Sequence, residues 1–259
     1  YKLVEVPYLG MEHQSSVTYG NQYKQGYLGK DLSGTGWGLK FDFIIIHESG
    51  HEWFANNITY KDIADMWIHE SFTNYSESLF LEYYYGKEAG AEYVIGCRNG
   101  IENDKPIIGH YDVNNEGSGD MYPKGANMLH TIRQIINDDA KWKSILRGLN
   151  KTFYHQTVTS KQIEDYINEQ PGVNFTRVYA QYLSTTQIPV FEYMFKNGTL
   201  GYHWTNCVSK FDMPVKVKIN GVETVLKPTT EWQSVKTTSE KRSLEVDKNF
   251  YVTASNIVE

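Results

Sequence analysis

The chain has 259 residues, 40% of them hydrophobic, with a formal net charge of −6 and a mean hydropathy of −0.52. Its length allows one large domain or two smaller ones, with a sizeable core in either case. The acidic balance argues against the phosphate backbone of nucleic acid as a partner, and no apolar run approaches the roughly 20 residues that a membrane-spanning helix needs.

The first 40 residues predict short strands, at LVEVPY and SSVTYG, joined by glycine-rich turns. Residues 41–185 have mostly helical patterns. A first helix carries the motif FIIIHESGHEW at 43–53 and is expected to end near residues 56–57. A second is expected from about Asp62 to Tyr85, and a third over about 87–103.

Four further helices are predicted before residue 187. One follows the segment PKG at 123–125, and the next carries apolar residues between 142 and 149. Thr159 and Gln162 form a predicted capping box that opens the next of these helices, which follows the one at 142–149. The last of the four covers about 174–184. Beyond them the pattern alternates with a period of two, and Asn220-Gly221 predicts a tight hairpin turn.

The predicted fold class is therefore α+β, with two domains. Residues 1–187 form a mainly helical domain with a partial N-terminal sheet, and residues 188–259 form a small all-β sandwich. The segment QIPVFEY joins the two. Two cysteines, Cys97 and Cys207, are too few for a disulfide scaffold.

The segment HESGH at 47–51 contains the strongest chemical motif. On a helix, residues i and i+4 lie on one face, so His47 and His51 can each direct a ring nitrogen to one ion. Glu48 lies about 100° further round the helix, where it can act as a general base. The alternative interpretation is a polar helix end with a satisfied histidine pair.

A catalytic zinc site needs three protein ligands and one open position. Glu70 follows His51 by 19 positions, in the predicted second helix. That helix runs back antiparallel, and eight residues of it cover about 12 Å, which brings Glu70 opposite the histidines. Gly50 is a poor helix former, and we expect it to let the second helix approach closely. The sequence thus predicts one Zn²⁺ per chain, bound by His47, His51 and Glu70.

The combined pattern HESGHEW, 18 residues and then ESFTNYSE resembles the gluzincin aminopeptidases, the aminopeptidase N and leukotriene hydrolase family. LGMEHQ at 9–14 is similar to that family's GxMEN motif, and MYPKG at 121–125 to its YxKG segment. The resemblance covers about residues 1–190, and the β tail is similar to a small domain that follows in many members. It implies a thermolysin-like catalytic domain.

The resemblance implies a zinc metallo-aminopeptidase that hydrolyses the N-terminal peptide bond of peptides with a free N-terminus. Glu48 would take a proton from the zinc-activated water, and Tyr122 would donate a hydrogen bond to the developing oxyanion. Glu12 would bind the α-ammonium group of the substrate. Gly10 and Met11 would lend backbone groups to the substrate strand.

Two departures from the family pattern stand beside the implied ligands. His13 occupies the place of the asparagine in GxMEN, and His69 that of the asparagine before the third ligand, where we interpret it as a neighbour and not a ligand. Asn74 and Glu77 lie one and two turns past Glu70 and are candidates to accept the second N–H of a metal-bound histidine. Solvation at the surface is the alternative for both.

Three alternatives remain open from the sequence. The chain could be a zinc endopeptidase, an enzyme with leukotriene-hydrolase-like epoxide chemistry, or an inactive peptide-binding fragment. Because the family has a large β domain before this region, we expect one or more upstream domains of the same polypeptide. An exported or periplasmic location agrees with the resemblance, but no residue of this stretch decides the compartment.

Overall fold

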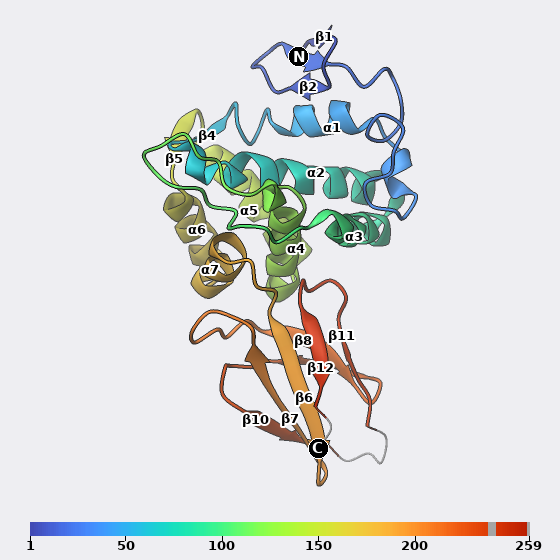
Figure 1. Cartoon of the computed structure of the whole chain (residues 1–259), viewed down its shortest axis with the longest axis vertical. Helices are drawn as coiled ribbons and strands as arrows, with labels where there is room; N and C mark the ends of the chain where they lie inside the picture. The colour runs from blue at the N-terminus through green and yellow to red at the C-terminus, as the bar shows by residue number, and fades with distance from the viewer. Residues whose placement is uncertain (238–241, 258–259) are drawn as a thin grey trace.

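The computed structural model describes residues 1–237 and 242–257. A small N-terminal sheet lies at one end, a helical layer follows, and a part made only of strands lies at the other end (Figure 1). The expected β range 188–259 includes residues 238–241 and 258–259, which lie outside the described residues. No helix of the described part is both long and apolar enough to cross a membrane.

The N-terminal sheet has three short strands: β1 (Leu3–Glu5), β2 (Gly10–Met11) and β3 (Val17–Tyr19). Their order is β1-β3-β2, with β3 parallel to β1 and antiparallel to β2. All three residues of β3 are buried, whereas those of β1 are exposed. The central strand therefore anchors the sheet over the first helix, and β2 forms an edge beside it.

The first two helices, α1 (Phe43–Gly50) and α2 (Trp67–Tyr85), lie side by side in opposite directions (Figure 1). The side chain of Asp42 caps α1 by accepting from the Ile45 N–H. The α-helix ends about six residues earlier than expected. After it, backbone hydrogen bonds span three, four and then five residues, so the regular ladder is lost in a series of turns.

Gly50 explains how closely the two helices approach. A Cβ added there would lie 2.5 Å from Ser76 Oγ and 3.0 Å from Thr73 Cγ2, both on α2. These separations are below ordinary van der Waals contact, so the close packing requires glycine at this position. The expectation that a small residue permits this approach agrees with the geometry.

Of the later helices, α3 (Lys87–Gly96) and α4 (Pro123–Ile136) pack directly against α2, whose Trp67 is fully buried. The capping box at Thr159 is formed as predicted, and the expected third helix is shorter, because residues 97–100 turn into a 3-10 segment. The remaining elements of this part are η1 (Trp37–Leu39), β4 (Ile58–Tyr60), η2 (Ile63–Asp65), α3 (Lys87–Gly96), η3 (Cys97–Gly100), η4 (Gly119–Met121), α4 (Pro123–Ile136), α5 (Asp139–Thr152), β5 (Gln156–Val158), α6 (Ser160–Glu169) and α7 (Thr176–Ser184).

The C-terminal strands form two sheets with a buried apolar interior between them. One has the order β10-β7-β6-β12 and the other β11-β8-β9. The predicted hairpin at Asn220-Gly221 joins β8 to β9. The bounds of the strands are β6 (Val190–Lys196), β7 (Thr199–Thr205), β8 (Val215–Ile219), β9 (Val222–Leu226), β10 (Gln233–Lys236), β11 (Leu244–Val246) and β12 (Thr253–Asn256).

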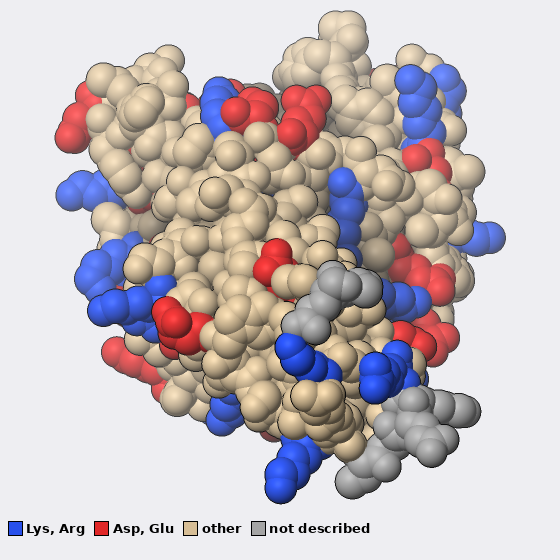
Figure 2. All heavy atoms as spheres, turned by 60° about the horizontal axis from the view of Figure 1, so that its bottom comes forward, with Lys and Arg blue, Asp and Glu red and all other residues tan. Residues whose placement is uncertain are grey.

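A short segment between β11 and β12 contacts the helical part. Tyr182 of α7 donates from its hydroxyl to the Tyr251 carbonyl at 2.6 Å, and the Tyr251 N–H donates to Thr131 Oγ1 at 3.1 Å. These two buried hydrogen bonds tie the strands to the helical part. On the outer face shown in Figure 2, Lys and Arg side chains are interspersed with Asp and Glu.

We predict that Gly50→Ala lowers the free energy of unfolding by about 1 kcal/mol, although alanine favours helices. Overpacking against α2 costs about 1–3 kcal/mol and outweighs the helix-propensity gain of up to about 1 kcal/mol. Denaturant unfolding measures the change. The control Gly119→Ala meets no atom within 4 Å and should be neutral. Adding Ser76→Ala should restore part of the loss, and a more stable Gly50→Ala variant would contradict the packing argument.

Candidate active site

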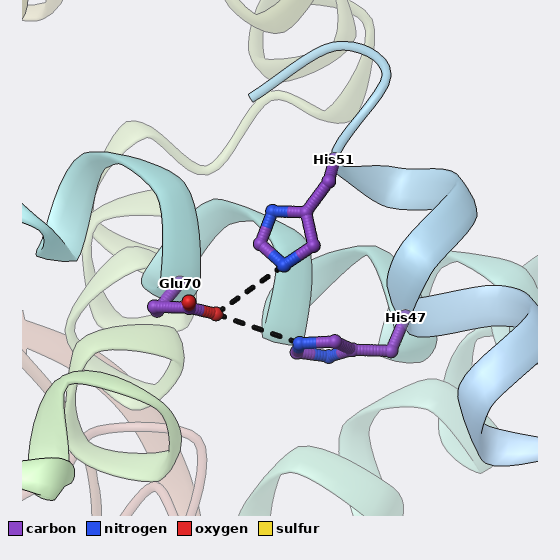
Figure 3. Close-up of side chains that lie close together, drawn as sticks. All are labelled: His47, His51 and Glu70. Carbon is purple, nitrogen blue, oxygen red and sulfur yellow. Dashed lines mark ion pairs between the residues drawn. The ribbon is translucent and has the colours of Figure 1, made fainter. Parts of the chain in front are cut away.

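Three buried side chains converge where α1 lies against α2. His47 of α1 and His51, the residue directly after α1, point towards Glu70 on α2 (Figure 3). Glu70 Oε2 lies 3.4 Å from Nε2 of His47 and 3.4 Å from Nε2 of His51. All three side chains are at most 7% exposed. The two helices therefore bring together the three residues that the sequence analysis selected as metal ligands.

The second ring nitrogen of each histidine faces an acceptor, and His51 Nδ1 also lies 3.1 Å from the Thr73 hydroxyl, which can donate or accept. His47 Nδ1 lies 2.8 Å from Glu77 Oε1, and His51 Nδ1 lies 3.0 Å from the Phe54 carbonyl oxygen. Each Nδ1 must therefore carry a hydrogen to make its contact. In the neutral rings, this leaves both Nε2 lone pairs directed at Glu70.

The charges at this centre depend on one another. Burial lowers the pKa of His47, but the carboxylates of Glu70 and Glu77 outweigh burial and raise it to about 10. Burial likewise opposes the charge of Glu70, whose pKa is nevertheless lowered by the two histidines that face its carboxylate. The protons on the imidazoles thus balance the buried carboxylate, and a cation between the same groups would do so as well.

The arrangement fits a zinc ion. Among the described residues, Glu70 Oε2 is a buried oxygen without a hydrogen-bond partner. Ligands about 2.0–2.1 Å from a tetrahedral zinc lie about 3.3 Å apart, and the observed separations of Glu70 Oε2 from the two histidines are 3.4 Å. Two imidazole nitrogens and one carboxylate are also a ligand set of catalytic zinc sites.

Glu77 and Asn74 are the candidates to accept the second N–H of a metal-bound histidine. They lie on the side of His47 that carries Nδ1. Glu77 is completely buried, and the Asn74 amide donates to both of its carboxylate oxygens, at 3.0 and 3.1 Å. The alternative of a solvated surface position does not hold for either residue, because Asn74 is also buried. A third partner, Tyr93 on α3, donates to Glu77 Oε2 at 2.5 Å.

His69 lies beside the centre but faces another way. Its Nε2 accepts from the Tyr60 N–H at 3.1 Å, and its ring lies 4.2 Å from that of Tyr60. Burial, followed by the charge of His51, lowers the pKa of His69 to about 3. A neutral imidazole that accepts from a backbone N–H supports β4, which agrees with the interpretation of His69 as a neighbour.

Two further acids lie at the His51 end of the centre. The ligand atoms of Glu12, Glu48 and His51 lie within 4.8 Å of one another. Glu48 is buried and Glu12 is half-buried. Burial raises the pKa of Glu48 to about 6, although the two histidines oppose the change. Two carboxylates so close together favour a cation or a proton between them.

Gly10 and Met11 form β2, the edge strand that passes over α1. A Cβ added at Gly10 would lie 2.8 Å from both Glu48 Oε1 and Ile44 Cγ2, so only glycine allows this approach. Asn56 donates to the Glu12 carbonyl at 3.2 Å and fixes the end of the strand. Along β2, the chain therefore passes from Ile44 towards His51, with Glu12 at the His51 end.

Tyr122 stands at the start of α4, whose first residue is Pro123. Ser71 of α2, next to Glu70, donates to the Met121 carbonyl at 2.7 Å and ties this turn to the site. The Tyr122 ring lies 5.9 Å from that of His47. Burial and then the Glu70 carboxylate raise the pKa of Tyr122, so its hydroxyl keeps its proton and remains a donor.

A pocket of about 410 Å³ opens beside the centre, on the side of His47 and Tyr122. Its wall is mostly apolar and comes from six separated parts of the chain. The lining residues are Leu9, Tyr27, Leu32, Phe43, Ile44, His47, Glu48, Asn74, Cys97, Gly100, Tyr122 and Pro123.

The histidines outside the motif, at 13, 110, 130, 155 and 203, do not belong to the candidate metal groups found among the described residues.

Sequence reasoning missed several residues that contact this centre. Tyr93, Ser71 and the Phe54 carbonyl reach it from positions without ligand spacing. The Phe43 ring stacks on His47 with centroids 5.2 Å apart. Only the i−4 position of Phe43 relative to His47 was a signal in the sequence; nothing local marked the others.

Residues 3–182 match the model of the peptidase family M1 domain. The chain therefore belongs to peptidase family M1. It is 25% identical over 193 residues to aminopeptidase N of Lactococcus lactis, covering 70% of this chain and 22% of that protein. It is 22% identical over 202 residues to a probable aminopeptidase 1 of Sulfurisphaera tokodaii, covering 73% and 25%. The chain thus spans about a quarter of the length of these relatives.

Solved structures agree on the fold. Legionella pneumophila aminopeptidase A in complex with aspartic acid superposes with a TM-score of 0.73 at 12% identity, over 99% of this chain and 32% of that one. A mutant M1 zinc metallopeptidase from Deinococcus radiodurans, bound to a Tyr-Ser-Ala substrate, gives 0.55 at 20% identity, over 71% and 39%. The mixed helix-and-sheet architecture is therefore that of M1 aminopeptidase structures.

Proposed function

We propose that this chain is the catalytic region of a zinc metallo-aminopeptidase that removes the first residue of peptides with a free N-terminus. The observation that carries the proposal is the buried convergence of His47, His51 and Glu70, with Glu48 and Glu12 beside it. The relatives named as aminopeptidases support it. The proposal gives a role to every charged group at the centre.

Glu48 acts as the general base. A zinc ion held by His47, His51 and Glu70 would lower the pKa of a coordinated water to about 7 and polarise the scissile carbonyl. Burial raises the pKa of Glu48 to about 6 in the metal-free protein, so the carboxylate is ionised at neutral pH. It can accept the proton of the attacking water. It can then pass that proton to the leaving amine.

Tyr122 stabilises the developing oxyanion by donating a hydrogen bond to it. Because its hydroxyl keeps its proton, it can donate to the oxygen on which negative charge develops. A donor aimed at that position typically contributes about 3 kcal/mol to lowering the barrier. The bond between Ser71 and Met121 fixes the turn that carries this hydroxyl, so the donor is held in place before the reaction begins.

Glu12 binds the α-ammonium group, and β2 binds the substrate backbone. Since β2 lies at the edge of its sheet, Gly10 and Met11 can pair with an extended peptide. With the ammonium group at Glu12, the first peptide bond lies at Glu48. An internal peptide bond brings no cation to Glu12, which would make the enzyme an exopeptidase.

The direction in which a bound peptide runs along β2 also determines where its second residue lies. Glu12 lies towards His51, whereas the pocket is lined by Leu9 and Ile44 at the other end of β2 and α1. A peptide with its N-terminus at Glu12 therefore extends towards the pocket. We infer that the residue after the cleaved bond enters it and that apolar side chains are preferred there.

We predict that Glu48→Gln retains about one zinc per chain but lowers peptide hydrolysis by at least about 100-fold, because general-base catalysis contributes about 10²–10⁴. Metal analysis and an aminoacyl-chromogen assay measure the two quantities. Glu88→Gln, on the exposed start of α3, is the control. Loss of zinc with retained activity would overturn the assignment, and zinc without any turnover in the wild-type chain would favour the peptide-binding alternative.

We predict that N-acetylation of a peptide lowers its kcat/KM by about 10–100-fold, since a hydrogen bond to a charged group is worth about 1.5–3 kcal/mol. Glu12→Gln should lower cleavage of the free peptide by a similar factor and remove most of the difference between the two substrates. Steady-state kinetics on both substrates decide this. Equal cleavage of both by the wild-type protein would support the zinc endopeptidase alternative.

We predict that peptides with leucine at the second position are cleaved about tenfold better than those with aspartate, as expected for an apolar pocket. Leu32→Asp, which adds charge to the pocket wall, should reduce this ratio. Leu28→Asp is the matched control, because Leu28 lies in the same loop but does not line the pocket. Unchanged preference in Leu32→Asp would place the second residue elsewhere.

A further inference from the structure

Tyr93 is a buried tyrosine that the proposed reaction does not use. It lies on α3, which packs along α2, and is only 2% exposed. Its hydroxyl donates to Glu77 Oε2 at 2.5 Å, while Glu77 Oε1 faces His47 Nδ1 at 2.8 Å. A continuous chain of hydrogen bonds therefore links α3 to a candidate metal ligand.

Glu77 depends on this chain because its carboxylate has no access to solvent. A buried carboxylate is costly unless donors surround it. Three donors do so in the described structure: the His47 ring, the Asn74 amide and the Tyr93 hydroxyl. Without the hydroxyl, Oε2 would keep only Asn74 at 3.1 Å, and the carboxylate would be free to rotate away from His47.

The orientation of Glu77 matters for His47 in two ways. A carboxylate only accepts, so it requires the hydrogen on Nδ1 and leaves Nε2 free to face Glu70. The carboxylate also fixes the plane of the His47 ring. The Phe43 ring stacks on this imidazole, with the two ring centroids 5.2 Å apart. Outer partners of this kind usually change metal affinity by about 10–100-fold.

We propose that Tyr93 is a positioning residue of the metal centre, whose hydroxyl holds Glu77 in the orientation that fixes the His47 ring. This inference rests on the proposed zinc site but does not depend on the reaction or substrate. It predicts that a change on α3, outside the site itself, alters zinc binding. A tyrosine that only fills the core would alter stability alone.

The test is the zinc affinity of Tyr93→Phe, measured by competition with a chromogenic chelator. We expect binding about 10–100-fold weaker than in the wild-type protein. Tyr182→Phe is the matched control, because it also removes one buried hydroxyl, which donates to the Tyr251 carbonyl at 2.6 Å at the junction with the strands. The control should lose stability but keep wild-type zinc affinity.

A double-mutant cycle with Glu77→Gln shows whether Tyr93 acts through Glu77. In the Glu77→Gln background, Tyr93→Phe should cause little further loss of zinc affinity, because the carboxylate that it orients is gone. The unfolding of the metal-free variants is measured in parallel, so that affinity is compared only between folded proteins. If Tyr93→Phe is too unstable to fold, Tyr93→His, which retains a donor, should restore both folding and zinc binding.

Two outcomes would overturn the inference. One is a folded Tyr93→Phe variant that binds zinc as tightly as the wild-type protein. The other is a loss of affinity that adds fully to that of Glu77→Gln, which would show that Tyr93 acts independently of Glu77. Failure of the proposed function is distinct, since it would appear as a wild-type protein that binds no zinc or binds zinc without cleaving peptides.

Discussion

The close antiparallel packing of α1 against α2 is the constraint on which the site depends. It brings the Nε2 atoms of His47 and His51 within 3.4 Å of one buried carboxylate oxygen of Glu70. Such a group is stable only if its negative charge is balanced, because no solvent reaches it. Protons on the imidazoles balance it in the metal-free protein, and a divalent cation held by the same groups would do so as well. Glycine at position 50 makes this approach possible.

Separate elements surround this centre, each with a different task. Beyond the histidines, Glu77 and the Phe54 carbonyl determine which ring nitrogen carries the hydrogen. The edge strand β2 lies over α1 with Glu12 at its end, and the start of α4 presents Tyr122. Because helices and strands supply these groups, they are already held in place when a substrate arrives, which is how positioned donors lower a barrier.

Membership of peptidase family M1 and the geometry support one another. The family model covers residues 3–182, which contain every candidate site residue from Gly10 to Tyr122. The chain spans about a quarter of its curated relatives, so its substrates and partners are proposals based on the site. The strongest physical support is the pairing of a buried candidate metal-ligand set with a second acid, Glu12, whose carboxylate lies within 4.8 Å of that of Glu48, the proposed general base.

Much of the fold and the inner site was predictable from local rules. The i, i+4 spacing placed His47 and His51 on one helix face, and the Thr159 capping box and the Asn220-Gly221 hairpin follow from hydrogen bonds within a few residues. The spacing to Glu70 required only a turn and an antiparallel return. The helix spacing, the capping box and the hairpin need no knowledge of distant contacts, because neighbouring residues determine them.

The tertiary structure decided the rest. Strands β11 and β12 are neighbours in the sequence but join different sheets. Tyr93 reaches Glu77 from another helix, and the pocket draws Leu9, Leu32 and Cys97 from distant segments. The sequence by itself determined which side chains can share a helix face and which can turn the chain. Only packing decided which distant groups meet, because such contacts depend on how whole elements approach one another and not on any local pattern.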